Sequence, residues 1–216
     1  MTRLTHAIIF DCEFATIEGS QHRFWCGPYD PDPVVVQIGA VRLDLSSTFD
    51  IQQQLRVFVK PRTRHGDAQR IDPFLTELTG ITDLEVQEKG LLLPDAIAAL
   101  AEFAAGSGFW SWGKDEINLL AISCFVEGIA VPLPATRFGN ICTLLLKAGM
   151  PYEDIQKTRS GKLAQYFRLS PPVLREHDAL DDALSLAFVL RHLLREGKLH
   201  PDDFDPARGL AQSRTS

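Results

Sequence analysis

The order of the predicted secondary structure constrains the fold of this chain most. Three segments rich in apolar and β-branched residues come first, and they predict strands at 6–10, 34–43 and 55–59. Turn-forming residues at 44–47 indicate that the strands at 34–43 and 55–59 pair antiparallel, beside the strand at 6–10. Helices are predicted afterwards at 73–79, 94–105, 115–127, 140–148, 161–167 and 178–195, with one further strand at 109–112. This order predicts an α/β fold with a mixed sheet of about five strands, the first three an antiparallel meander, flanked by helices.

Length and composition fit one globular domain. The 216 residues are 45% hydrophobic and 23% charged, which is enough apolar material to bury a core. We expect residues 1–200 to form this single domain and residues 201–216 to be a flexible tail, because few apolar residues follow position 204. A long loop rich in Gly, Pro and Asp is predicted at 17–33.

The charge balance is acidic. Lys and Arg number 22 against 28 Asp and Glu, so the formal net charge is −6. This excludes a strongly basic nucleic-acid binder but not an enzyme that clusters its carboxylates. The four cysteines form no C-x-x-C pair, which argues against a zinc ribbon. The sequence shows no secretory signal and no apolar run of about 20 residues, so we expect a cytoplasmic protein with reduced thiols and no membrane partner.

Two acids directly follow the first apolar run. Asp11 and Glu13 project to the same side of an extended chain, because side chains alternate along a strand. Like charges at this spacing repel each other unless a cation lies between them, and carboxylates are preferred ligands of Mg²⁺ and Mn²⁺. Taken alone, the pair also fits two solvated acids at the end of a strand.

Further candidates lie at the starts of two helices. Asp115 follows the short aromatic strand, where it also fits a helix N-cap. In the last helix, a step of about 100° per residue places Asp182 at the edge of the apolar face, whereas Asp178 and Asp181 point away. Asp178 is expected to cap that helix, and His177 precedes it as either a functional or an ordinary loop histidine.

The combination and order of these groups resemble the DEDDh 3′→5′ exonucleases of the RNase H-like superfamily, which are DnaQ-like. The resemblance spans about residues 5–195. It is carried by Phe10–Glu13, Val36–Val41, Phe58–Pro61, Leu78–Thr82 and the His-Asp-Ala-Leu-Asp-Asp-Ala run at 177–183. The run 11–16, Asp-Cys-Glu-Phe-Ala-Thr, departs from the D-x-E-T of proofreading subunits and is similar to the D-x-E-[AF]-T of the Eri-type branch. Trp112–Asp115 is similar to the W-G-x-x-D of that branch.

The resemblance implies a metal-dependent 3′→5′ exonuclease that releases nucleoside 5′-monophosphates. It implies that two divalent cations, Mg²⁺ or Mn²⁺, are held by Asp11, Glu13, Asp115 and Asp182. His177 would be the general base, a role that suits an imidazole near neutral pH. The substrate implied is nucleic acid, with RNA expected first and single-stranded DNA second.

The resemblance also implies a pocket for the terminal nucleotide. It would be formed by Phe14, Ala15, Thr16 and Ile81, although Phe14 and Ile81 also fit simple core packing. Basic residues gather at 56–70 and 157–162, where they fit contacts with the phosphate backbone or a solvated face.

Three other functions fit the same residues. They are a catalytically silent nucleic-acid-binding module, a regulator that acts through a partner protein, and a phosphodiesterase for short oligonucleotides. The presence of four acids and a histidine favours an enzyme over the silent module.

Overall fold

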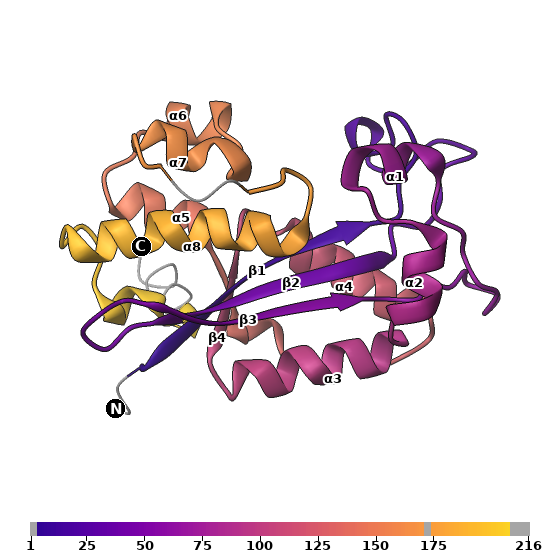
Figure 1. The fold of residues 1–216 in the computed structure, drawn as a ribbon, viewed down its shortest axis with the longest axis horizontal. Coiled ribbons are helices and arrows are strands. Elements are labelled where there is room, and N and C mark those ends of the chain that lie inside the picture. Colours follow the sequence, from indigo (N-terminus) through magenta and orange to yellow (C-terminus); the bar gives the residue numbers. More distant parts are fainter. Residues whose placement is uncertain (1–3, 171–173, 208–216) are drawn as a thin grey trace, which may run out of the picture.

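The predicted sheet of five strands is confirmed. The computed structural model describes residues 4–170 and 174–207, and its strands lie in the order β3-β2-β1-β4-β5 (Figure 1). The bounds are β1 His6–Phe14, β2 Val35–Asp44, β3 Ile51–Phe58, β4 Gly108–Ser111 and β5 Phe138–Asn140. The first three strands are antiparallel neighbours, whereas β4 pairs in parallel with both β1 and β5. The central strand β1 therefore has a partner on each side.

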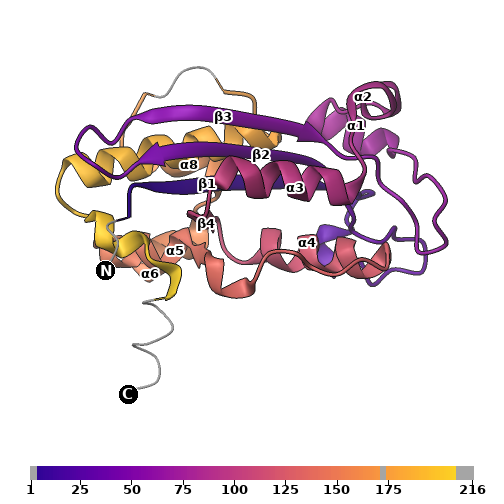
Figure 2. The ribbon, with the colours of Figure 1, turned by 90° about the horizontal axis from the view of Figure 1, so that it is seen from below.

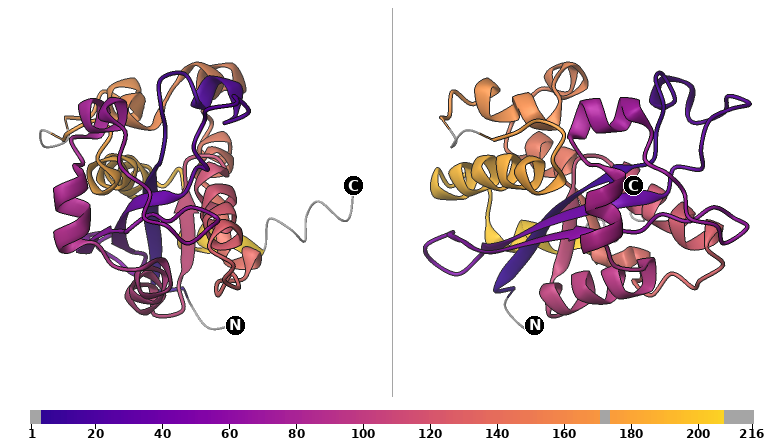
Figure 3. Two further views of the ribbon diagram at one scale, coloured as in Figure 1. Left: turned by 90° about the vertical axis from the view of Figure 1, so that its right-hand side faces the viewer. Right: turned by 45° about the vertical axis from the view of Figure 1, so that its right-hand side comes forward.

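Helices cover both faces of this sheet. Their bounds are α1 Pro73–Thr79, α2 Asp83–Lys89, α3 Leu93–Ala104, α4 Asp115–Val126, α5 Ile141–Lys147, α6 Tyr152–Lys157, α7 Leu163–Tyr166 and α8 Ala179–Arg195. Helix α8 lies against one face, and α3 and α4 lie against the other (Figures 2 and 3). None of the described helices is both long and apolar enough to cross a membrane.

The alternation of side chains along β1 separates its two faces. Ile8, Phe10 and Cys12 pack with α3 and α4, whereas Ala7 and Ile9 pack with α8. The strand continues through Phe14, four residues beyond the predicted end, so its acids lie within the strand. Asp11 and Glu13 share the alternation of Ala7 and Ile9, which directs both carboxylates toward the α8 side.

Short elements differ most from the prediction. Strand β5 was missed because it has three residues and lies where a helix was expected to begin. That helix starts one residue later, after Asn140, whose side chain accepts a hydrogen bond from the Cys142 N–H. Helices α2 and α6 were also missed, and each has only seven or six residues. These errors do not change the topology.

The start of the expected tail is ordered. Residues Pro201–Phe204 form a 3₁₀ helix, and Phe204 is buried with its ring 5.5 Å from that of Trp110 in an edge-on arrangement. The prediction of a flexible tail from 201 is therefore wrong for these four residues, because one aromatic side chain anchors them to the core. Residues 208–216 of that predicted tail lie outside the described residues.

A glycine on β2 sets the position of α8. Gly39 pairs with Asp11 of β1, and a Cβ atom added to Gly39 would collide with the backbone of Ala179 and Leu180. The first turn of α8 can therefore lie directly on the sheet at the level of Asp11. This close approach brings the start of α8 to the acidic face of β1.

Replacing Gly39 with alanine should lower the free energy of unfolding by about 3 kcal/mol, because the added methyl group meets backbone that cannot rotate away. Urea denaturation measures the change. Gly106→Ala is a matched control, since Gly106 has open space around it but a φ of +87°, and should cost only about 1–2 kcal/mol of backbone strain. Equal losses in the two variants would contradict the close contact at Gly39.

Candidate active site

Three of the predicted residues converge at the α8 face of β1. Glu13, His177 and Asp182 each offer a ligand atom, and these atoms all lie within 4.8 Å of one another. Asp11 lies near enough to interact electrostatically with Glu13 and Asp182. The structure therefore brings together four of the five residues that sequence analysis assigned to catalysis and metal binding.

The fifth predicted residue lies outside this cluster. Asp115, the first residue of α4, is exposed, whereas Glu116 is buried and interacts directly with Asp11. The side chains of Asp11 and Glu116 lie in direct contact, and Ser111 also interacts with Glu116. The structure therefore favours Glu116 over Asp115 as the fourth acid of the cluster, because one step along a helix turns a side chain by about 100°.

The spacing of the sequence motif contains the missing signal. In W-G-x-x-D, the acid stands four positions after the tryptophan, and four positions after Trp112 is Glu116. Asp115 was predicted because it is an aspartate, as in the motif. Glu116 instead stands at the position that the motif gives to its acid. The parallel pairing of Ile9 with Trp110 then places the start of α4 beside the acids of β1.

The cluster carries more negative charge than its surroundings compensate. Asp11, Glu13 and Glu116 are only 8%, 9% and 8% exposed. Burial raises the pKa of Asp11 well above its usual range, and the neighbouring acids raise it further. Burial likewise raises the pKa of Glu13 to about 8, of Glu116 to about 7 and of Asp182 to about 6. Charged side chains this buried require a counter-ion.

These residues fit a divalent metal ion. The buried Oε2 atom of Glu116 has no hydrogen-bond partner among the described residues. A cluster of carboxylate oxygens with one oxygen left unsatisfied is the donor set that hard cations such as Mg²⁺ and Mn²⁺ prefer. Asp11, Glu13, Glu116 and Asp182 are therefore the candidate ligands.

Metal should stabilise the protein increasingly as the pH rises. The folded-state pKa values lie above the ordinary values of 3.8 for Asp and 4.5 for Glu, so the cluster favours folding at acid pH. That contribution is lost as the pH rises through about 6, 7 and 8. The melting temperature of the metal-free protein should fall across this range. Mn²⁺ at about 100 times its Kd should raise it by about 5–10 °C.

Thermal melts with EDTA or with Mn²⁺ at several pH values measure both effects. The increase with Mn²⁺ should be larger at the alkaline end, where the carboxylates are ionised. An increase of the same size at every pH, or none at all, would contradict a metal site made of these carboxylates.

A hydrogen-bond network fixes the start of α8. As predicted, Asp178 is the N-cap, and its carboxylate accepts hydrogen bonds from the Leu180 and Asp181 N–H groups. Arg56 forms an ion pair with Asp178 at 2.7 Å, and the Gln37 amide donates to the same carboxylate at 3.3 Å. These contacts tie α8 to strands β2 and β3.

His177 and Asp182 depend on this anchored turn. His177 directly precedes the cap and has a φ of +61°, a conformation that non-glycine residues seldom adopt. Its backbone N–H donates a hydrogen bond to the Asp182 carboxylate. Asp181 points elsewhere, and its carboxylate accepts a hydrogen bond from the Arg175 N–H at 2.8 Å. Of the two adjacent acids, Asp182 alone belongs to the cluster.

The predicted nucleotide-binding side chains lie in the core. Phe14, Ala15, Thr16 and Ile81 are all buried. Phe14 packs with α3 and α4, whereas Ala15 and Ile81 belong to a separate apolar cluster. The structure thus favours the alternative of core packing, since these side chains expose almost no surface on which a base could stack.

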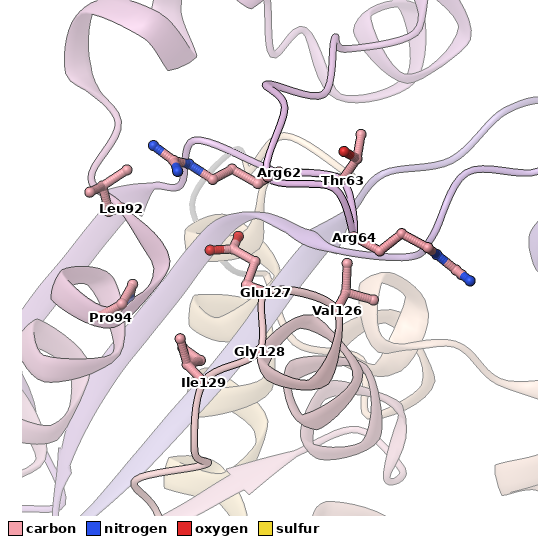
Figure 4. A pocket seen from close by; sticks show the side chains of 10 residues that line it. Arg62, Thr63, Arg64, Leu92, Pro94, Val126, Glu127, Gly128 and Ile129 are labelled. Carbon is pink, nitrogen blue, oxygen red and sulfur yellow. The ribbon is translucent and has the colours of Figure 1, made fainter.

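Two cavities are relevant to the site. One of about 220 Å³ is lined by Arg159, Ser160, Gly161, Lys162, Glu176, His177 and Asp182. The other, of about 340 Å³, lies between the loop after β3, the start of α3 and the end of α4 (Figure 4). Arg62, Leu92 and Glu127 are among its lining residues, and no member of the acidic cluster is. The smaller cavity therefore adjoins the candidate active site.

Comparisons with known proteins agree on the fold. No family model and no curated protein matches this chain. The nuclease domain of 3′hExo, a DEDDh family member solved with rAMP, is 18% identical with a TM-score of 0.74, covering 91% of this chain and 94% of that chain. Cell-death related nuclease 4 (CRN-4) is 17% identical with a TM-score of 0.69, covering 90% and 65% of the two chains.

A more distant match comes from a zinc-bound complex of E. coli exonuclease I with single-stranded DNA. It is 15% identical with a TM-score of 0.60, and the match covers 94% of this chain and 43% of that chain. Identities this low establish the fold alone. The chain therefore has the RNase H-like fold of the DEDDh exonucleases, as its motifs predict.

Proposed function

We propose that this chain is a metal-dependent exonuclease that hydrolyses nucleic acid from the 3′ end. The observation that carries the proposal is the cluster of buried Asp11, Glu13 and Glu116 with half-buried Asp182, and with His177 at its edge. Ionised carboxylates in such numbers destabilise a fold unless they bind cations. The same fold in 3′hExo and exonuclease I supports a nuclease over other metal-dependent hydrolases.

Each residue has a defined part in the proposed reaction. Asp11, Glu13, Glu116 and Asp182 would hold two divalent cations, Mg²⁺ or Mn²⁺. The cations would supply an activated water and neutralise charge on the scissile phosphate. His177 accepts a proton from the attacking water through its exposed ring. The bond from phosphorus to the 3′ oxygen of the preceding nucleotide breaks, that oxygen is protonated, and a nucleoside 5′-monophosphate leaves.

RNA is the proposed substrate, with single-stranded DNA as the second choice. The Phe14-Ala15-Thr16 run after the first acids is similar to the Eri-type form of the motif. Among the solved structures that share the fold, 3′hExo is bound to rAMP, and a related 3′-exonuclease recognises a histone mRNA stem-loop. Exonuclease I, which is less similar, is bound to single-stranded DNA.

Hydrolysis of end-labelled oligonucleotides tests this function. Purified protein is incubated with 5′-labelled single-stranded RNA or DNA in Mg²⁺, in Mn²⁺ or in EDTA. We expect a ladder that shortens from the 3′ end, releases nucleoside 5′-monophosphates and disappears in EDTA. Asp11→Asn is the matched control, because it keeps the shape of the side chain and removes its charge. No shortening with either metal would overturn the proposal.

A further inference from the structure

The cavity beside His177 has two unlike walls. His177, Asp182 and Glu176 form one wall, at the start of α8. Arg159 and Lys162 line the other, together with the short turn Ser160–Lys162 that precedes α7. The cavity of about 220 Å³ is therefore bounded by candidate catalytic groups on one side and by two cationic side chains on the other.

The two cations are available for a ligand. Arg159 and Lys162 are exposed, and neither forms an ion pair with any residue in 4–170 or 174–207. In the basic stretch 56–70, two of the cations are already paired, Arg56 with Asp178 and Arg64 with Asp32. Unpaired guanidinium and ammonium groups are the side chains that most often bind phosphate.

The basic wall is held close to the acidic cluster. A methyl group added at Gly161 would lie only 3.8 Å from Asp182 Oδ1. Directly after this turn, Leu163 and Ala164 are buried in the core cluster that includes Leu186 and Leu190 of α8. Helix α7 lies alongside α8 (Figure 1). The turn that carries Arg159 and Lys162 is thus fixed at the mouth of the site.

We propose that Arg159 and Lys162 bind a non-scissile phosphate of the nucleic-acid strand, an inference that rests on the proposed exonuclease function. The scissile phosphate belongs at the carboxylate cluster, where bound cations would neutralise its charge. A second phosphate of the same strand meets the basic wall. Such contacts hold the strand in register without reading its bases, so the proposal predicts binding that tolerates sequence and weakens with salt.

A double variant, Arg159→Ala with Lys162→Ala, tests the basic wall. Its KM for single-stranded RNA should rise by about 10–100-fold, because two charge-assisted contacts are lost. The p-nitrophenyl ester of thymidine 5′-monophosphate carries only one phosphate, so it cannot reach the basic wall. In the double variant, kcat/KM for this ester should fall by a factor at least ten times smaller than the factor by which KM for RNA rises. Lys157→Ala is the matched control, because Lys157 is an exposed cation of the same stretch that does not line the cavity.

Oligonucleotides that carry one neutral methylphosphonate locate the phosphate. Binding is measured in Ca²⁺ with the neutral linkage placed at each of the last few positions of the strand. For the wild type, a neutral linkage at one non-scissile position should weaken binding relative to the fully charged oligonucleotide. For the double variant, the same neutral linkage should change the affinity little, because the contact is already missing. The proposal would be overturned if the two proteins differed in their response to the neutral linkage only at the scissile position. It would also be overturned if the neutral linkage weakened binding equally in both proteins at every position. If the wild type cleaves no substrate, the exonuclease function fails instead.

Discussion

Replacing Glu116 with glutamine should lower the metal-dependent hydrolysis rate by at least about 10²-fold, whereas Asp115→Asn should change it by no more than about threefold. Glu116 is buried against Asp11 and has one oxygen without a partner, so the loss of its charge removes a metal ligand. Asp115 is exposed and outside the cluster. Initial rates on labelled RNA, measured at several Mg²⁺ concentrations, compare the two variants directly.

The stability of these variants separates a lost ligand from a damaged fold. Glutamine has nearly the shape of glutamate, and it removes one ionised group from a cluster in which burial raises the pKa values. The metal-free Glu116→Gln variant should therefore melt at or above the temperature of the wild type near pH 8. If Asp115→Asn abolishes hydrolysis and Glu116→Gln does not, the assignment of Glu116 is wrong.

Replacing His177 with alanine should lower the hydrolysis rate by about 10²–10⁴-fold, the usual contribution of a general base. The side chain is exposed to the cavity, and its ring contributes no packing to the core. The positive φ of His177 is tolerated because the Asp178 cap and its ion pair with Arg56 hold the backbone directly after His177. Single-turnover rates measure the loss without interference from product release.

Metal affinity shows whether His177 is a base or a ligand. The His177 ring lies within 4.8 Å of ligand atoms of Glu13 and Asp182, so the geometry permits either role. We expect the Mn²⁺ affinity of His177→Ala, measured by calorimetry, to stay close to that of the wild type. A tenfold or larger loss of Mn²⁺ affinity would assign His177 to the metal instead.

Much of the fold was predictable because its signals are local. Asp72 and Pro73 predicted the start of α1, and the Asp72 carboxylate accepts a hydrogen bond from the Phe74 N–H. Gly80 predicted its end and has a φ of +72°. Elements that depend on distant partners were missed, such as β5, which is held by pairing with β4. Phe204 was assigned to a tail because its contact with Trp110 is invisible in the local sequence.

In the candidate site, too, local geometry was predictable from the sequence and tertiary packing was not. Asp11 and Glu13 share a face because strands alternate, and the helical step of α8 separates Asp182 from Asp181. The choice between Asp115 and Glu116 depends on how α4 packs against β1, which residue type alone does not reveal. The burial of Phe14 and Ile81 likewise follows from tertiary packing, which a resemblance of motifs does not specify.

If the acidic cluster binds metal and Glu116 is one of its ligands, a bound ion should be visible there. Anomalous scattering from a crystal of this chain grown with Mn²⁺ and a nucleoside 5′-monophosphate locates such an ion. We expect anomalous peaks among Asp11, Glu13, Glu116 and Asp182, with the nucleotide phosphate bound to the same ions. A map with no peak at this cluster, or with Asp115 as the ligand in place of Glu116, would contradict this expectation.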